Sequence, residues 1–308
     1  MDNLKFEFLK RDHSRLLNIA IFTTNRSFED IYDIIKNSCN KIFVVVPENR
    51  LDSEKIKLVK QVCNKRSIDV LVQPKKDRVK DFNDILLQNK VNLGISWSYS
   101  QILCLSTLQL FYEGVWNMHG GKIPEYRGAN VLQWAIVNGE TEMGVTWHTM
   151  DEKIDGGYII EDNIIEVKDS ENALDIRDKV FDKAVEMFRL IWKKYNSEGI
   201  KTKKVDISKG SYYRGRTPLD GLINKTYSKK DIVNLLRAQC HPWPKPVVLL
   251  DKLYYVEDIC FEDSLGDNIF EYVCKNGEKV RLKVSEVYDI DLINNSNTLF
   301  IKLVLFHI

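Results

Sequence analysis

The sequence has no long hydrophobic run and almost no excess of charge of either sign. No stretch approaches the roughly 18 to 20 apolar residues that a membrane span requires. Lys plus Arg number 45 against 44 Asp plus Glu, so no net charge draws the chain to nucleic acid or to a membrane surface. The stretch MDNLKFEFLKRDHSR is too charged for a secretory signal peptide. We therefore expect a cytoplasmic globular protein without a membrane or nucleic-acid partner.

The cysteines lack the spacing of a metal site or of a disulfide framework. No C-x-x-C pair and no metal-like cluster occurs, and most of the six cysteines stand in apolar or helical contexts. Reduced structural thiols and no bound metal are expected. The six are Cys39, Cys63, Cys104, Cys240, Cys260 and Cys274.

What the chain does have, from Leu16 onward, is a regular alternation of buried-strand and helical patterns. Such alternation predicts an α/β fold with a doubly wound, mostly parallel sheet covered on both faces. The turn after the first strand, TTNRSF, contains neither G-x-G-x-x-G nor G-K-[ST], so NAD and ATP are poor cofactor candidates. The strands are expected at 16–22, 41–47, 68–74 and 91–97, and the helices near 28–37, 53–64 and 79–89.

The rest of the chain predicts a smaller second domain. A helix near 129–138, strands at 143–150 and 157–167 and a long amphipathic helix from Ala173 complete the first domain. A lysine-rich, glycine-punctuated linker follows at 193–210, and then come short strand-like runs that predict a small β-rich, barrel-like domain. We place the domains at 1–200 and 201–308.

One strand end carries an amide and an imidazole on the same face. In VWNMHGGKIPEYRGAN, residues 115–130, Asn117 and His119 are two residues apart, and side chains with that spacing share one face of a strand. The carboxyl end of a strand is where ligands bind in open α/β sheets. An imidazole there can take a proton, and an amide can donate to an oxygen that gains charge. The pair suits attack on a carbonyl, although a core histidine capped by an asparagine remains the alternative.

A third group would orient His119, and the best candidate is Asp155 in MDEKIDGGYII. Its rivals Asp151 and Glu152 begin the same loop and look solvent-facing. His148 alternates with Trp147 and faces either the core or the cleft. No serine or cysteine stands beside this set, so we expect the substrate to supply the nucleophile.

The run NMHGGKIPEYRGANVLQWAIVNGETEMGVTWHTMDEKIDGG resembles the active-site signature of the 10-formyltetrahydrofolate-dependent formyltransferases. That signature is Asn-x-His, then Leu-Pro-x-Tyr-Arg-Gly, then Gly-Val-Thr, then Asp-x-Gly. Further family patterns are echoed by YYRGRTPLDG (212–221) and RAQCHPWPKP (237–246). The resemblance implies catalytic roles for Asn117, His119 and Asp155.

The resemblance also implies a pocket for the pterin of 10-formyltetrahydrofolate, the expected formyl donor. By position, the segment YSQIL at 99–103 would line the pocket, and the 120–124 loop and the turn before Asp155 would complete it. The implied cofactor-binding residues are Tyr99, Ile102, Leu103, Gly120, Gly121, Ile123 and Asp151.

The charge of the second domain helps to predict which molecule accepts the formyl group. Residues 206–308 hold 14 Lys plus Arg and 14 Asp plus Glu, and a neutral domain is a poor clamp for tRNA. The motif run is more similar to the sugar-nucleotide formyltransferases, so the expected acceptor is a 3- or 4-amino deoxysugar on a nucleotide diphosphate, a precursor of bacterial surface polysaccharide. A methionyl-tRNA formyltransferase and a non-catalytic folate or sugar-nucleotide binding protein remain the alternatives. The apolar run LFIKLVLF near the C-terminus allows a homodimer.

Overall fold

The computed structural model describes residues 6–75, 78–240, 243–250, 253–260 and 268–286. The chain forms two compact units, and each unit is assembled from separate segments. Unit one contains Met1–Arg127, Gly144–Ile165 and Lys179–Tyr212, and unit two contains Gly128–Met143, Glu166–Asp178 and Tyr213–Ile308. The domain boundary expected near residue 200 stays a prediction.

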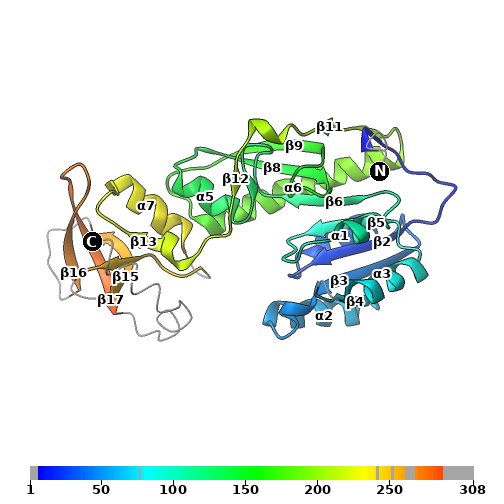
Figure 1. Ribbon diagram of the computed structural model, residues 1–308, viewed down its shortest axis with the longest axis horizontal. Helices are drawn as coiled ribbons and strands as arrows, with labels where there is room; N and C mark the ends of the chain where they lie inside the picture. Colours follow the sequence, from blue (N-terminus) through cyan, green and yellow to red (C-terminus); the bar gives the residue numbers. More distant parts are fainter. Residues whose placement is uncertain (1–5, 76–77, 241–242, 251–252, 261–267, 287–308) are drawn as a thin grey trace. The chain divides into compact units, whose positions relative to one another are not determined.

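Unit one is built on an eight-stranded sheet with the order β11-β9-β8-β6-β5-β2-β3-β4 (Figure 1). The five strands from β6 to β4 run parallel, whereas β8 is antiparallel to β6. The predicted α/β class with a mostly parallel sheet is confirmed. The strands are β2 (Asn18–Thr23), β3 (Lys41–Pro47), β4 (Asp69–Gln73), β5 (Leu93–Trp97), β6 (Val115–His119), β8 (Glu142–Thr149), β9 (Tyr158–Glu166) and β11 (Lys203–Lys204).

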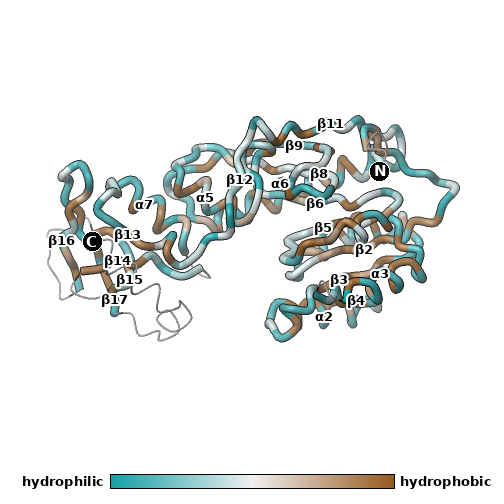
Figure 2. The backbone as a smooth tube through the Cα atoms, viewed as in Figure 1, coloured by the Kyte–Doolittle hydropathy of each residue, from teal (hydrophilic) through white to brown (hydrophobic). Residues whose placement is uncertain are grey.

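The parallel strands are buried because both faces of the sheet are covered. Every residue of β2 and of β5 is buried, and Figure 2 draws β2, β3 and β5 largely as hydrophobic tube. The strand order reverses between β2 and β5. Strands β3 and β4 lie on one side of β2, whereas β5 and β6 lie on its other side. The helices are α1 (Phe28–Ile35), α2 (Glu54–Lys65), α3 (Val79–Gln88), α4 (Leu105–Leu108), α5 (Val131–Val137), α6 (Ala173–Asn196) and α7 (Lys229–Ala238).

Helix α6 covers the face of the sheet opposite to α3 and α4. The Trp147 indole donates to Ala184 O of α6 at 3.0 Å, and the Trp116 ring meets the Tyr195 ring edge-on at 4.9 Å. On the other face, Val115 belongs to a buried cluster with Phe82 of α3. Burying one side chain of this size contributes about 1.5–3 kcal/mol, so packing fixes which face each residue of β6 presents.

The short strands of unit one lie at its margins. Strand β1 (Phe8–Leu9) pairs with β10 (Ile200–Lys201), which ties the start of the described chain to the segment after α6. Strand β7 (Arg127–Gly128) pairs with β12 (Tyr212–Tyr213), and in each of these strands the first residue belongs to unit one and the second to unit two.

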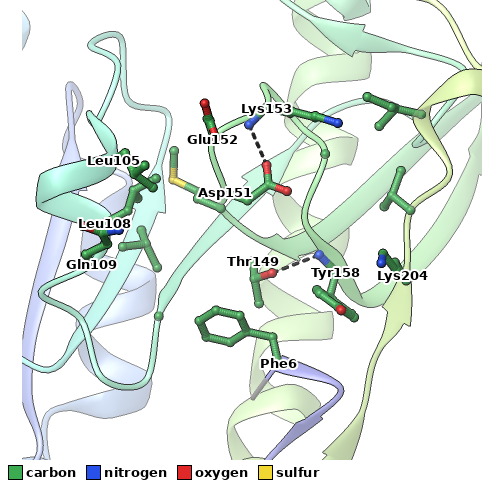
Figure 3. Close-up of a pocket in the computed structure, with 16 residues that line it drawn as sticks. Phe6, Leu105, Leu108, Gln109, Thr149, Asp151, Glu152, Lys153, Tyr158 and Lys204 are labelled. Carbon is green, nitrogen blue, oxygen red and sulfur yellow. Dashed lines mark hydrogen bonds between the residues drawn. The ribbon is translucent and has the colours of Figure 1, made fainter. Parts of the chain in front are cut away.

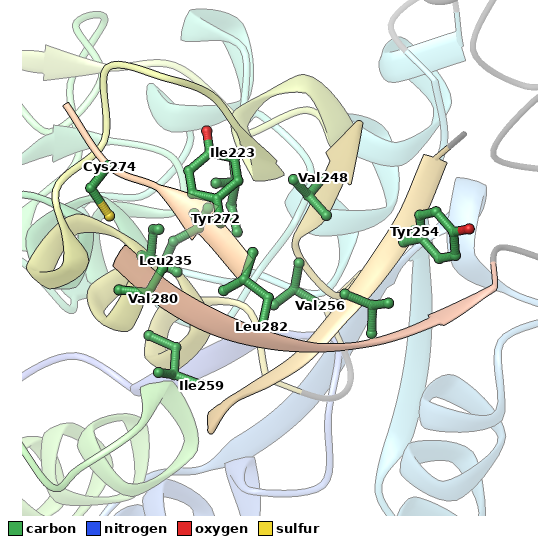
Figure 4. Packing of buried hydrophobic residues seen from close by; sticks show 12 residues of the cluster. Ile223, Leu235, Val248, Tyr254, Val256, Ile259, Tyr272, Cys274, Val280 and Leu282 are labelled. Carbon is green, nitrogen blue, oxygen red and sulfur yellow. The ribbon is translucent and has the colours of Figure 1, made fainter. Parts of the chain in front are cut away.

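Unit two contains a five-stranded sheet with the order β13-β14-β15-β17-β16. Its core gathers alternate residues of the strands with Ile232 and Leu235 of α7 (Figure 4). The predicted β-rich region is confirmed as a separate C-terminal sheet, while the run LFIKLVLF lies outside the described residues. The strands are β13 (Leu222–Ile223), β14 (Val247–Leu249), β15 (Leu253–Cys260), β16 (Ile269–Val273) and β17 (Lys279–Glu286).

Candidate active site

The antiparallel pairing of β6 and β8 brings three polar side chains together. Asn117 stands opposite His148, and His119 stands opposite Thr146. Because Trp116 packs on α6, strand alternation turns its neighbours Val115 and Asn117 to the opposite face, together with His119. The strand pair therefore sets an amide and two imidazoles side by side.

His119 is held by a main-chain carbonyl. Its Nε2 lies 2.6 Å from Tyr126 O, and a carbonyl oxygen can only accept, so Nε2 donates and Nδ1 carries the free lone pair. Nδ1 lies 3.6 Å from Oδ2 of Asp155. The side chain is 7% exposed. The nitrogen of His119 that is able to accept a proton is thus the one beside the carboxylate.

His148 is buried on the same face of the sheet as Asn117 and orients its amide. Its Nδ1 donates to Thr149 O at 2.9 Å, which leaves Nε2 as an acceptor for Nδ2 of Asn117 at 3.0 Å. The same Nε2 lies 3.4 Å from Oδ1 of Asp155. The Asn117 amide is therefore fixed by one of its two hydrogens, and the second remains for another acceptor.

Asp155 sits between the two imidazoles in a left-handed backbone conformation. Its φ is +51°, which costs a non-glycine residue about 1–2 kcal/mol. The turn closes tightly behind it, because a Cβ on Gly157 would lie 1.8 Å from Thr149 O. The Tyr158 amide then donates to the Thr149 hydroxyl at 2.9 Å. Strain of this kind persists where surrounding contacts hold the residue, and here it aims a carboxylate at two histidines.

The surroundings keep His119 neutral. Burial lowers its pKa below the ordinary value of 6.5, the charge of Asp155 and the Tyr126 carbonyl oppose that shift, and His148 adds to it. A neutral imidazole can accept a proton, and the carboxylate beside it then stabilises the imidazolium. Together with the amide of Asn117, the cluster can take a proton from an attacking group and donate to an oxygen that gains charge.

A cavity of about 440 Å³ opens beside the turn that carries Asp155 (Figure 3). Leu105, Leu108, Val115 and Met150 give it an apolar wall, and Asp151 adds a carboxyl group. Burial raises the pKa of Asp151. In Figure 3, Asp151 stands between the α4 residues on one side and Tyr158 and Lys204 on the other.

Of the residues that the resemblance implied for the cofactor, Asp151 lines this cavity and the other six do not. The Tyr99 hydroxyl donates to Oε1 of Gln73 at 2.8 Å, and burial raises the pKa of Tyr99. Leu103 is 4% exposed within the core, whereas Ile102 is 73% exposed. The Gln73 amide donates to Ile102 O at 3.0 Å and so fastens this loop to the end of β4.

The loop after His119 is positioned by backbone contacts. A Cβ on Gly120 would lie 3.3 Å from a Val180 methyl carbon of α6, so Gly120 is packed closely against that helix. The Thr146 hydroxyl donates to Gly121 O at 2.8 Å, and Ile123 is buried.

The structure adds residues to the site and its surroundings that the sequence did not single out. Tyr126 acts through its main-chain carbonyl, which leaves no side-chain signal, and Phe6 reaches the cavity from far away in the sequence. Arg127 donates to Ile154 O at 3.3 Å. Its position inside the motif EYRG was the one available hint.

Two features are absent from the described residues. Over that part of the chain, no helix is long and apolar enough to cross a membrane. Nor do three or more His, Cys, Asp or Glu side chains among those residues gather as metal ligands.

Comparison with known proteins agrees with this fold. The family model described as formyl transferase matches residues 17–191, and the chain belongs to that family. The bifunctional polymyxin resistance protein ArnA of Wigglesworthia glossinidia brevipalpis is 32% identical over 203 residues. This match covers 62% of the chain but only 30% of that relative, so the chain spans less than a third of its length.

Solved structures share the fold. An N-formyltransferase from Helicobacter canadensis, in complex with folinic acid and dTDP-3-aminofucose, has a TM-score of 0.67 at 18% identity, covering 88% of this chain and 100% of that one. A 4-N formyltransferase from Francisella tularensis has a TM-score of 0.61 at 24% identity, covering 88% and 99%. At these identities the likeness is one of fold.

Proposed function

We propose that the protein transfers a formyl group from 10-formyltetrahydrofolate to the amine of a nucleotide-linked 3- or 4-amino deoxysugar. The observation that carries the proposal is the cluster of Asn117, His119, His148 and Asp155. Each of the first three side chains is oriented by a hydrogen bond, and the Asp155 carboxylate lies within 3.6 Å of both imidazoles. This cluster fits acyl transfer to an amine without a nucleophile from the protein.

The cavity beside the turn that carries Asp155 suits a folate donor, although Asn117, His119, His148 and Asp155 themselves do not line it. Its volume of about 440 Å³ falls in the usual range for a small-molecule site, roughly 300–1,000 Å³. The apolar wall offers contacts to the faces of a flat heterocycle, and Asp151 offers an acceptor to ring N–H groups. The solved relative that holds folinic acid supports a donor of this class.

The acceptor is inferred from charge and from relatives. The N-formyltransferase from Helicobacter canadensis was solved with a dTDP-linked amino sugar, and the curated relative named above is a polymyxin resistance protein. The neutral charge of residues 206–308 argues against tRNA as the acceptor. A nucleotide-linked sugar needs a smaller contact surface and no basic face.

In the proposed mechanism the donor supplies the formyl carbon, and the chain supplies proton transfer and charge stabilisation. His119 accepts the proton of the attacking amine at Nδ1, while its Nε2 stays bonded to Tyr126 O. Asp155 stabilises the imidazolium, and the second amide hydrogen of Asn117 donates to the formyl oxygen as charge develops there. His148 holds the amide in that direction. When the bond between the formyl carbon and N10 of the donor breaks, the imidazolium returns its proton to N10, so that tetrahydrofolate leaves and His119 is neutral again.

The test is an acceptor panel. The protein is incubated with 10-formyltetrahydrofolate and UDP-, dTDP- and GDP-linked amino sugars beside methionyl-tRNA, and the products are read by mass spectrometry. One formyl group gained by a sugar nucleotide is the expected result. Formylation of tRNA alone would overturn the acceptor, and folate binding without transfer to any amine would favour a binding protein.

A further inference from the structure

The turn that carries Asp155 is held partly by hydrogen bonds within the turn. The Lys153 amide donates to Oδ1 of Asp151 at 2.8 Å, and the Gly156 amide donates to Lys153 O at 3.1 Å. The side chain of Ile154 is 44% exposed and does not anchor the turn by burial. The carboxylate of Asp155 lies near both imidazoles, and the left-handed backbone that aims it there also needs contacts to the neighbouring main chain.

Arg127 supplies such a contact. Its Nη1 donates to the carbonyl oxygen of Ile154, the residue immediately before Asp155, at 3.3 Å. Nε of the same guanidinium is buried and has no hydrogen-bond partner among the described residues. The Arg127 amide donates to Ser211 O at 3.2 Å, which fixes the backbone from which this side chain extends.

The neighbour of Arg127 holds the other half of the catalytic pair. Tyr126 O accepts from Nε2 of His119, so two consecutive residues contact His119 on one side and the Asp155 turn on the other. Moving either contact would change the 3.6 Å separation between Nδ1 of His119 and the carboxylate.

We propose that Arg127 is a positioning residue, which holds the Ile154 carbonyl so that Asp155 keeps its left-handed conformation against His119. This inference rests on the proposed function for its kinetic consequence, but not for its structural one. A displacement of about 1 Å in a catalytic group can cost roughly 100-fold in rate.

The test compares Arg127→Met, which removes the donors, with Arg127→Lys, which keeps one. We expect Arg127→Met to lower kcat by about 10- to 100-fold while the KM of donor and acceptor stays within about 3-fold, and Arg127→Lys to recover part of the loss. Arg189→Met, at an exposed position of α6, is the matched control and should leave kcat unchanged.

The second readout is the titration of His119 by NMR with labelled histidine, assigned with His119→Gln. The groups facing His119 are Asp155, His148 and the Tyr126 carbonyl. When the carboxylate moves away, the pKa of His119 should fall in Arg127→Met, as it should in Asp155→Asn. This readout needs no turnover, so it tests the positioning role even if no acceptor is ever formylated.

Two outcomes would overturn the proposal. If Arg127→Met raises the KM of the acceptor at unchanged kcat, Arg127 is a substrate contact. If the pKa of His119 is the same in Arg127→Met as in the wild type, Arg127 does not position Asp155. If circular dichroism shows that Arg127→Met does not fold, Arg127→Gln and Arg127→Lys carry the same comparison.

Discussion

At the scale of the residue, the proposed mechanism divides the chemistry between two side chains, a base and an oxyanion donor. His119 is 7% exposed and is bound through Nε2, whereas Asn117 is oriented by His148. Losing either one removes a distinct part of transition-state stabilisation.

We therefore predict that His119→Gln and Asn117→Ala each lower kcat by about 100- to 1000-fold in the formyl-transfer assay. His13→Gln is the matched control, because His13 is exposed and lies outside the cluster. Near-full turnover by either variant would remove that residue from the mechanism.

The fall of kcat/KM at acidic pH should reflect the pKa of His119. Because burial lowers its pKa below 6.5, the neutral base persists below that pH, and the midpoint in kcat/KM should lie under 6.5. Asp155 raises the pKa, so in Asp155→Asn the midpoint should move to still lower pH. The measurement is kcat/KM across the acidic range for both proteins, and a midpoint that moves upward in the variant would contradict this arrangement.

Whether a site residue could be predicted from the sequence depends on how that residue acts. Asn117 and His119 were paired by strand spacing alone, since side chains two apart share a face. The face taken by His148 needed the register of β6 against β8, which spacing within one strand does not give. Tyr126 contributes a carbonyl oxygen, and no side-chain pattern encodes that.

At the scale of the element, the turn between β8 and β9 sets the position of Asp155. Gly157→Ala would place a methyl group against Thr149 O, since the ideal Cβ lies 1.8 Å from it. We expect the variant to lose about 1–3 kcal/mol of unfolding free energy and most of its turnover. Denaturant unfolding measures the first effect. Gly215→Ala is the control, because a Cβ there would lie 3.9 Å from its nearest neighbour, Oδ1 of Asn130. Equal stability of the two variants would show that the turn can relax.

The segment that precedes the short strand β1 should influence the cavity. Phe6 lines it, although the family match begins only at residue 17. Removing the ring in Phe6→Ala should raise the KM for the formyl donor by about 5- to 30-fold, because roughly 1–2 kcal/mol of apolar contact is lost. Phe8→Ala, on the same segment but outside the cavity wall, is the control. A donor KM equal to that of the wild type would place the donor elsewhere.

The helices and longer strands were predictable because their patterns are periodic. The strand expected at 41–47 is β3 at Lys41–Pro47, and the helix expected from Ala173 is α6 at Ala173–Asn196. The two-residue strands, such as β1 and β10, have no period to detect, and long-range pairing alone defines them.

At the scale of the whole molecule, the balance of charge constrains the partner. With a formal net charge of +1, the chain carries no overall positive charge to neutralise phosphates, the property that gives nucleic-acid binding its steep salt dependence. We predict that tRNA at physiological salt neither binds in a filter assay nor competes with the sugar nucleotide. Binding that weakens sharply between about 50 and 200 mM salt would contradict this prediction.

Unit two is built from three stretches of sequence, and two of them are interruptions of unit one. Helix α5, which packs on α7, comes from the first interruption. A gene fragment that stops after residue 212 would therefore still encode α5 but leave its hydrophobic side bare. A single crossover between genes cannot replace unit two as a whole, because two of its three segments lie within the sequence of unit one. We therefore expect the two units to be inherited together.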